Sequence, residues 1–235
     1  MFPLISRTKS LPETLSAIAD FIATHKFAHV ISLNPENFVE ASENAEFQSS
    51  YTQAELIIAD GTGIIVAAHI LGIRVGERIT GVDLMAQLVR IYPQKRILFV
   101  GAHHDAATQT LEHFACTLGV TGSGWKAFPD VDKNDPQLVN KIINEKPDII
   151  FIAFGSPAQE LWIEKHKQDL TGVVCIGVGQ AFDVYGGIIT RAPQFLRALG
   201  LEWLYRLVTQ PWRWRRQLRL FKFIYLVIRH RILAR

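Results

Sequence analysis

Polar side chains capable of acid–base or hydrogen-bonding chemistry follow short apolar runs along the chain. They come at or soon after the ends of four such runs: Ser32, Asn34, Asp60, Gln159 and Asp183. A carboxylate held on a turn can accept a proton from a reacting hydroxyl, and hydroxyl and amide groups can bind a polar substrate. Convergence of these groups in the fold would indicate a substrate site.

Each of these groups also has a structural interpretation. Asn34 precedes a proline, as at an ordinary helix N-cap, and Gln159 fits a capping box opened by Ser156. Asp60 could cap a helix that begins near Gly63, and the sequence supports this role as well as it supports catalysis. The spatial arrangement of the groups decides between the two interpretations.

The apolar runs themselves predict buried strands of a parallel sheet. Each is closed by glycine or a small polar residue, and they cover residues 29–34, 55–61, 96–102, 148–155 and 172–179. Helical patterns accompany them at about residues 35–50, 63–71, 81–92, 105–118, 135–146 and 157–169. The alternation predicts a doubly wound α/β fold with a mostly parallel sheet. Because ligands bind such sheets outside the carboxyl ends of the strands, we expect the polar groups to meet there.

The glycine-rich and acidic motifs are weaker indicators of chemistry. GTGIIV and GVGQAF contain only part of a dinucleotide-binding GxGxxG motif, and the chain has no P-loop motif. Asp130 and Asp132 have the spacing of a metal-holding carboxylate pair, but a solvated loop before a helix start at Asp135 explains them better. His103 and His104 lack further spaced ligands. We therefore expect no metal and no other cofactor.

The composition is that of a globular protein with a sizeable core, since 49% of the 235 residues are hydrophobic and 20% are charged. Cys116 and Cys175 lie far apart without zinc-binding spacing, which is typical of a reducing compartment. The N-terminus lacks the extended apolar region and cleavage site of a signal peptide. No run of 18 apolar residues predicts a membrane-spanning helix.

Charge is distributed unevenly along the chain. Residues 191–235 contain eleven Lys or Arg and one acid, a net charge of +10, whereas residues 1–190 contain fourteen basic and 21 acidic residues, a net charge of −7. This asymmetry predicts an α/β domain over residues 1–190 and a basic appendage over residues 191–235 that meets a negatively charged partner.

A helix in the appendage would have one apolar face, formed by Trp214, Leu218, Phe221, Tyr225 and Ile228. Beside this face would lie Leu220, Ile224 and Val227, and basic residues would flank it: Arg215, Arg216, Arg219 and Lys222. This pattern is typical of an interfacial helix on an anionic membrane. The alternatives are a buried terminal helix and a contact between copies in a homo-oligomer. We expect no nucleic-acid partner, because the apolar side is large and the body is acidic.

Seven motifs occur in order along the chain: SLNPE, IADGTG, ERITGVDL, FGSPAQELW, GVGQAFDVYGG, RAPQFLRALGLEWLYRL and QPWRWRRQL. From about residue 30 to residue 220, this order resembles the WecG/TagA/CpsF family of bacterial glycosyltransferases. The resemblance implies a Rossmann-like enzyme with a helical, membrane-binding C-terminal appendage. It implies metal-independent transfer of a sugar, with inversion, from a UDP donor to a polyprenyl-diphosphate-linked acceptor. The implied location is peripheral, on the cytoplasmic face of the plasma membrane, in cell-surface polysaccharide or teichoic acid synthesis.

The resemblance also implies roles for individual residues. Asp60 matches the proposed base, which takes the proton of the acceptor hydroxyl as it attacks the anomeric carbon. Ser32 stands where relatives usually have threonine and keeps the hydroxyl. Ser32, Arg78 and Gln159 match substrate-binding positions, and Asp183 matches a nucleotide contact. From their places after the predicted strands, we also expect Asn34 to bind substrate and Gly101, Gly155 and Gly179 to bind the nucleotide.

Three arginines of the appendage match basic positions that complete the site in the family: Arg206, Arg213 and Arg216. Guanidinium groups would stabilise the diphosphate as the glycosidic bond breaks, and the helix that follows Gly155 would present its N-terminus to phosphate. A soluble UDP-sugar-binding regulatory protein is the alternative, and it would explain the polar groups but not the appendage. The donor sugar stays open among N-acetylmannosamine, its uronic acid and other hexoses.

Overall fold

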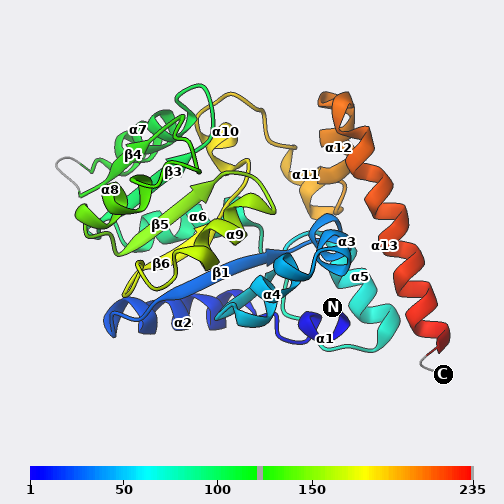
Figure 1. Ribbon diagram of the computed structural model, residues 1–235. Helices are drawn as coiled ribbons and strands as arrows, with labels where there is room; N and C mark the ends of the chain where they lie inside the picture. Colours follow the sequence, from blue (N-terminus) through cyan, green and yellow to red (C-terminus); the bar gives the residue numbers. More distant parts are fainter. Residues whose placement is uncertain (121–123, 234–235) are drawn as a thin grey trace.

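The computed structural model describes residues 1–120 and 124–233, without the side chains of residues 213 and 215–217. Within these residues the centre is a six-stranded, all-parallel sheet with the order β2-β1-β6-β5-β3-β4 (Figure 1). The strands are β1 (Ala28–Leu33), β2 (Leu56–Ala59), β3 (Ile97–Gly101), β4 (Lys126–Phe128), β5 (Ile149–Ala153) and β6 (Val174–Gly177). The predicted α/β class, with a parallel sheet and flanking helices, is confirmed.

Four strands lie within the predicted apolar runs, β1 begins one residue before its run, and β4 is additional. Every residue of β1, β2, β3, β5 and β6 is buried, which explains why these strands read as mainly apolar runs; β1 also contains the buried polar residues His29 and Ser32. In contrast, β4 is a three-residue edge strand in which Lys126 is exposed. It has no apolar run from which it could be predicted.

Helices follow or precede each strand: α1 (Phe2–Ile5), α2 (Leu11–Ala23), α3 (Pro35–Glu43), α4 (Ala45–Gln53), α5 (Thr62–Leu71), α6 (Gly81–Ile91), α7 (Ala106–Leu118), α8 (Leu138–Asn144), α9 (Ala158–Lys165), α10 (Ala181–Tyr185), α11 (Gln194–Ala198), α12 (Glu202–Thr209) and α13 (Trp214–Leu233). The predicted helix at 35–50 is two helices, because Asn44 ends α3 and its Oδ1 accepts the Phe47 N–H, starting α4. Outside the predicted helical patterns lie α1, α2 and α10–α12.

The sheet divides the core into two layers. On one face α2, α6, α7 and α10 pack against side chains such as Val30 and Phe99. On the other face, α8 and α9 cover β3, β5 and β6, whereas α1, α3, α4 and α5 cover β1 and β2. Successive strand residues point to opposite faces, so Val30 belongs to the first layer and Ile31 to the second.

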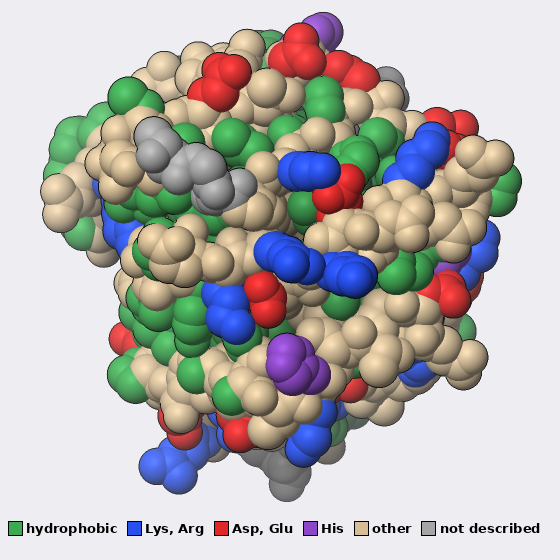
Figure 2. All heavy atoms as spheres, turned by 90° about the vertical axis from the view of Figure 1, so that its left-hand side faces the viewer, with side chains coloured by type: hydrophobic (Ala, Val, Ile, Leu, Met, Phe, Trp, Pro, Cys, Tyr) green, Lys and Arg blue, Asp and Glu red, His purple; other side chains and the backbone are tan. Residues whose placement is uncertain are grey.

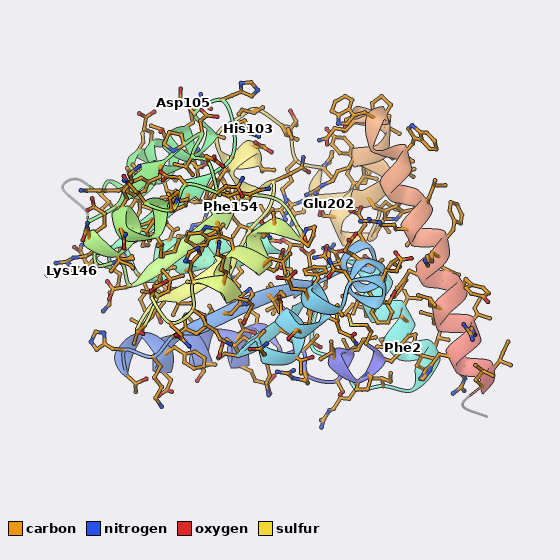
Figure 3. All side chains as sticks on the ribbon, viewed as in Figure 1. Phe2, His103, Asp105, Lys146, Phe154 and Glu202 are labelled. Carbon is orange, nitrogen blue, oxygen red and sulfur yellow. The ribbon has the colours of Figure 1, made fainter. Side chains whose placement is uncertain are left out.

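The C-terminal helix α13 runs along the side of the molecule formed by α3 and α5, away from α7 and α8 (Figure 1). Phe223 and Val227 are buried there, and Phe223 meets the Phe38 ring edge-on at 5.1 Å between centroids. Phe2 lies beside the C-terminal part of α13, where it stacks on His230 (Figure 3). The prediction that Val227 lies beside the exposed apolar face is therefore wrong, since Val227 faces the core.

The predicted apolar face of α13 lies on the opposite side of the helix and is exposed: Trp214, Leu218, Phe221, Tyr225 and Ile228. Two of the cations expected to flank it are engaged with α3, because Arg219 pairs with Glu40 and Lys222 with Glu43. The helix is thus fixed to the body by one face and leaves an apolar face uncovered. Its contact with a membrane and the domain boundary at residue 190 stay predictions.

Among the described residues, no helix is both long enough and apolar enough to cross a bilayer. The side of the molecule around β4, α7 and α8 has acidic and basic side chains interspersed over its surface (Figure 2). This side differs from α13, where apolar side chains gather along the helix.

Candidate active site at the carboxyl edge of the sheet

The residue that follows β2, Asp60, lies where the carboxyl ends of β1 and β2 meet. Its N–H donates to the Leu33 carbonyl at 2.9 Å, which joins it to the neighbouring strand. The next residue, Gly61, has a φ of 95° and is the N-cap of α5, where no side chain supplies a capping hydrogen bond. The alternative role of Asp60 as a helix cap is therefore wrong, and its carboxylate remains available for chemistry.

The environment of Asp60 favours a carboxyl group that can gain and lose a proton near neutral pH. Burial raises the pKa of Asp60 from 3.8 to about 6 and is the largest cause of the shift. The positive charges of Arg206 and Arg78 and a hydrogen bond from the Gly81 N–H oppose the rise, whereas the negative charge of Glu202 adds to it. A base with such a pKa combines a large ionised fraction at neutral pH with useful proton affinity.

Arg78 and Ser32 lie on the segments next to Asp60. Arg78 pairs in register with Ala59 at the end of β2, and its Nη2 donates to the Arg197 carbonyl at 3.1 Å. Ser32 is buried near the end of β1, and its carbonyl accepts the Tyr51 hydroxyl at 2.8 Å. Ser32 lies near the carboxyl edge, as its place in an apolar run predicted, whereas the position of Arg78 beside β2 was not predicted from its place in the sequence.

Asn34 performs the structural role that the sequence offered as an alternative. Its Oδ1 accepts the Asn37 N–H at 2.8 Å, so the side chain caps α3. Its part in substrate binding stays a prediction, and the amide nitrogen or the second lone pair of the oxygen could fill it.

Gln159 connects the ends of β5 and β6. The side chain is 4% exposed, its Nε2 donates to Glu160 Oε1 at 2.8 Å, and its Oε1 accepts the Gly179 N–H at 3.3 Å. Close approach is allowed because Gly177, at the end of β6, has no side chain: a Cβ there would come within 2.5 Å of the amide. The capping box expected from Ser156 is not formed, since the N-cap of α9 is Pro157 and no side chain caps it.

The predicted nucleotide-binding residues occupy the turns after three strands. Gly101, Gly155 and Gly179 all have positive φ, which lets the chain turn sharply away from β3, β5 and β6. Asp183 lies in the first turn of α10. Burial raises the pKa of Asp183, and His103 and His104 on the turn after β3 oppose the rise. The turns after β3 and β6 therefore lie close together.

Appendage residues that the sequence did not single out reach the same edge. Arg191 forms a two-pronged ion pair with Asp83, with nitrogen–oxygen distances of 2.6 and 2.7 Å. Glu202 accepts a hydrogen bond from Arg206 at 2.9 Å and lies on the side of α12 nearer to the sheet (Figure 3). Two features of the sequence could have drawn attention to the acidic residues of this group. Asp83 lies in the motif ERITGVDL, and Glu202 is the one acidic residue of the basic appendage. Of the three predicted arginines, Arg206 is described, whereas the side chains of Arg213 and Arg216 lie outside the described residues.

The candidate metal ligands make other contacts. Asp130 lies 3.5 Å from the ring of His103, and Asp132 Oδ1 accepts the Asn134 N–H at 2.9 Å. In the described part of the chain, no three His, Cys, Asp or Glu side chains are grouped as metal ligands.

Two surface hollows on the described part of the chain lie away from the carboxyl edge. One of about 470 Å³ lies near the amino ends of β3 and β4 and is lined by residues such as Arg90 and Leu118. Another of about 320 Å³ lies between α4 and α9. The site is therefore located by its converging polar groups, which fit the place where parallel α/β sheets bind ligands.

The fold and this edge define a Rossmann-like α/β protein with a polar, acid–base-capable site. The sequence matches the profile of the glycosyl transferase WecG/TagA/CpsF family over residues 4–235, and the chain belongs to this family. The resemblance inferred from the seven motifs is confirmed, and the chain is a glycosyltransferase by family.

Three similar proteins bear one name, N-acetylglucosaminyldiphosphoundecaprenol N-acetyl-beta-D-mannosaminyltransferase. The relative from Bacillus spizizenii is 33% identical over 213 residues, covering 89% of this chain and 82% of the relative. The relative from Bacillus subtilis is 30% identical over 226 residues, covering 92% and 86%. The relative from Staphylococcus aureus is 32% identical over 183 residues, covering 75% and 70%.

Proposed function

We propose that the chain transfers N-acetylmannosamine, with inversion, from a UDP donor to N-acetylglucosaminyl-diphosphoundecaprenol. The names of the relatives support this acceptor and favour N-acetylmannosamine over its uronic acid and other hexoses. The observation that carries the proposal is Asp60, a carboxylate at the carboxyl edge that caps no helix and has a pKa of about 6.

In this reaction Asp60 acts as the general base. Its carboxylate takes the proton of the acceptor hydroxyl while the hydroxyl oxygen forms a bond to the anomeric carbon of the donor sugar. The bond between that carbon and the diphosphate breaks, and UDP leaves with the bonding electrons. Attack opposite to the leaving group inverts the anomeric carbon, so an α-linked nucleotide sugar would give a β-linked product, which fits the beta-D-mannosaminyl group in the relatives' name.

The remaining residues bind the two substrates. Arg78, Gln159, Ser32 and Asn34 contact the sugars, and Asp183 contacts the nucleotide. The turns after β3, β5 and β6 let the backbone approach the nucleotide, through Gly101, Gly155 and Gly179.

Positive charge for the departing diphosphate comes from guanidinium groups rather than from a metal. Arg206 is the described member of this set, and it lies close enough to Asp60 to influence its pKa. Arg213 and Arg216 would complete the set. Charged donors placed where negative charge develops are among the largest contributions to catalysis.

The appendage lies on the cytoplasmic face of the plasma membrane as a peripheral element. Its support is the exposed apolar surface that continues from α11 to α13: Phe195, Leu199, Trp203, Leu204, Val208, Trp212, Trp214, Leu218, Phe221, Tyr225 and Ile228. An acceptor carried on a long polyprenyl chain stays in the bilayer, so the enzyme has to work at its surface. Apolar and aromatic side chains on helices with basic flanks suit that position.

The proposal is tested by reconstitution. Vesicles containing phosphatidylglycerol and the lipid-linked acceptor are incubated with the protein and, separately, with UDP-N-acetylmannosamine, its uronic acid and UDP-glucose. We expect a lipid product that is heavier by one N-acetylmannosamine and β-linked by NMR. UDP binding without transfer to any acceptor would instead support the soluble regulatory protein.

A further inference from the structure

The segment that joins the sheet to α12 is held against the site by charged side chains. Arg191 lies three residues before the start of α11 at Gln194, and its side chain is 16% exposed. Its guanidinium holds both carboxylate oxygens of Asp83, and its Nη2 also reaches Thr80 Oγ1 at 3.3 Å. Thr80 is the N-cap of α6 and Asp83 lies in its first turn, so the contact is to the start of a helix that packs on the sheet.

The same network continues into α12. Glu202, which is 12% exposed, lies 3.9 Å from Arg191 Nε and 2.9 Å from Arg206 Nη2. Glu202 and Arg206 are four residues apart and therefore share one face of the helix. Asp83, Arg191, Glu202 and Arg206 thus form a continuous series of alternating charges, and its last two members lie close enough to Asp60 to influence its pKa.

Other faces of α12 are apolar and uncovered. Trp203 is 43% exposed, Leu204 is 40% exposed and Val208 is 73% exposed. An eight-residue helix therefore carries both the charged end of the network and part of the surface assigned to the membrane. The charged face of α12 is tied to the body through Arg191 and Asp83, and the hydrogen bond from Arg78 to the Arg197 carbonyl holds the preceding helix α11.

We propose that Arg191 and Glu202 are positioning residues, which hold α12 so that the Arg206 guanidinium lies at the carboxyl edge beside Asp60. The inference rests on the proposed function, since it names residues that prepare that site. Ion pairs taken out of water contribute little to stability compared with apolar packing, but they define geometry. Two nearly buried charges at this junction are therefore better explained by the placement of Arg206 than by stability.

The charges around Asp60 give the inference a specific signature. Glu202 and Arg206 face Asp60 from α12, Arg78 faces it from the segment before α6, and Tyr51 lies nearby on α4. Glu202 partly neutralises the positive charge of Arg206, and its own negative charge repels the ionised Asp60 carboxylate. Removing the charge of Glu202 should therefore ease the ionisation of Asp60, whereas removing Arg206 should oppose it.

The first experiment is a double-substitution cycle on the ion pair. Arg191→Gln and Asp83→Asn are made singly and together in the full chain, and turnover is measured on the vesicle acceptor. We expect Arg191→Gln to lower kcat about 10- to 100-fold, the scale of a misplaced catalytic group. The same change should have a smaller effect when Asp83 is already asparagine. The matched control is Lys126→Gln, a change on the edge strand β4 that breaks an exposed ion pair with Glu145. This variant should keep full turnover.

The second experiment separates positioning from folding through the pH profile. Glu202→Gln keeps the shape and the acceptor oxygen but removes the charge. The pKa of Asp60 should then fall, so the acidic limb of the pH profile, where kcat drops as Asp60 is protonated, should move to lower pH. Arg206→Gln should move the same limb to higher pH. A residue that only stabilised the fold would change the melting temperature and leave the position of the limb unaltered.

The outcomes distinguish this inference from the proposed function. A wild-type chain that transfers no sugar from any donor would refute the proposed function. An active wild-type chain whose folded Arg191→Gln variant keeps full kcat, or whose Glu202→Gln variant keeps the wild-type limb, would refute the positioning role alone.

Discussion

Replacing the Asp60 carboxylate, or protonating it, should stop the transfer without unfolding the protein. With a pKa of about 6, Asp60 is about nine-tenths ionised at pH 7 and about one-tenth ionised at pH 5. At the ordinary value of 3.8 it would still be more than about nine-tenths ionised at pH 5. Turnover should therefore fall about tenfold between pH 7 and pH 5, because only the ionised form accepts the proton.

Asp60→Asn should lower turnover about 10²- to 10⁴-fold, the usual contribution of a general base, and should remove the acidic limb. UDP binding, measured by calorimetry, should change little because the amide keeps the size of the side chain. The matched control is Asp132→Asn on the exposed loop after β4, which should keep both turnover and the limb. Turnover that stays level from pH 7 to pH 5, or an active Asp60→Asn variant, would refute the role of Asp60 as the base.

The same substitution should make the protein more stable at alkaline pH. The folded-state pKa of Asp60 lies above its unfolded-state value, so the ionised group lowers the free energy of unfolding above about pH 6. This cost shrinks as the pH falls from 6 towards 3.8 and is absent at lower pH. A pKa shift of about two units lowers the free energy of unfolding by at most about 3 kcal/mol. Urea unfolding should therefore show Asp60→Asn to be more stable than wild type at pH 8 and equally stable at pH 4.

Three further expectations concern the appendage and the acidic loop. Leu218→Glu with Phe221→Glu should greatly weaken sedimentation with anionic vesicles while leaving the melting temperature nearly unchanged, because both side chains are more than half exposed. Phe223→Ala should lower the free energy of unfolding in urea by about 3–5 kcal/mol, because Phe223 is buried against α3. Chelation by EDTA should leave turnover unchanged, and Asp130→Ala with Asp132→Ala should have a mild effect, because guanidinium groups are proposed to stabilise the diphosphate.

Each of these has a contradicting result. Vesicle binding that survives both glutamates would place the membrane contact elsewhere than on α13. A loss of less than about 1 kcal/mol at Phe223 would mean that α13 does not share the core of the body. Turnover lost on chelation and restored by a divalent cation would revive the carboxylate pair as a metal site.

Several features of the fold and site could be predicted from the sequence because their causes are local. Strands buried on both faces read as apolar runs, so five strands were found, and the residues after them fall at the carboxyl edge whatever the strand order. Asp60 and Ser32 could therefore be placed at one edge before any contact was known. The motifs added the family, since their order survives even where individual residues are ambiguous.

Tertiary structure decided what depends on partners distant in sequence. The strand order places β6 between β1 and β5, so the Gly179 N–H meets Gln159 rather than solvent. A three-residue edge strand such as β4 has no local apolar signal, because its pairing with β3 alone defines it.

The C-terminal helix shows the same division. Its sequence is apolar on more than one side, so periodicity alone could not choose the face that packs on the body. Contacts with Phe38 and its neighbours determine this face, because they bury Phe223 and Val227 and leave Leu218 and Phe221 exposed. Likewise, Arg191 and Asp83 are 108 positions apart, and only the folded chain brings a guanidinium to that carboxylate. Local pattern thus determined which elements form and where their polar ends lie, whereas long-range packing determined which side chains meet.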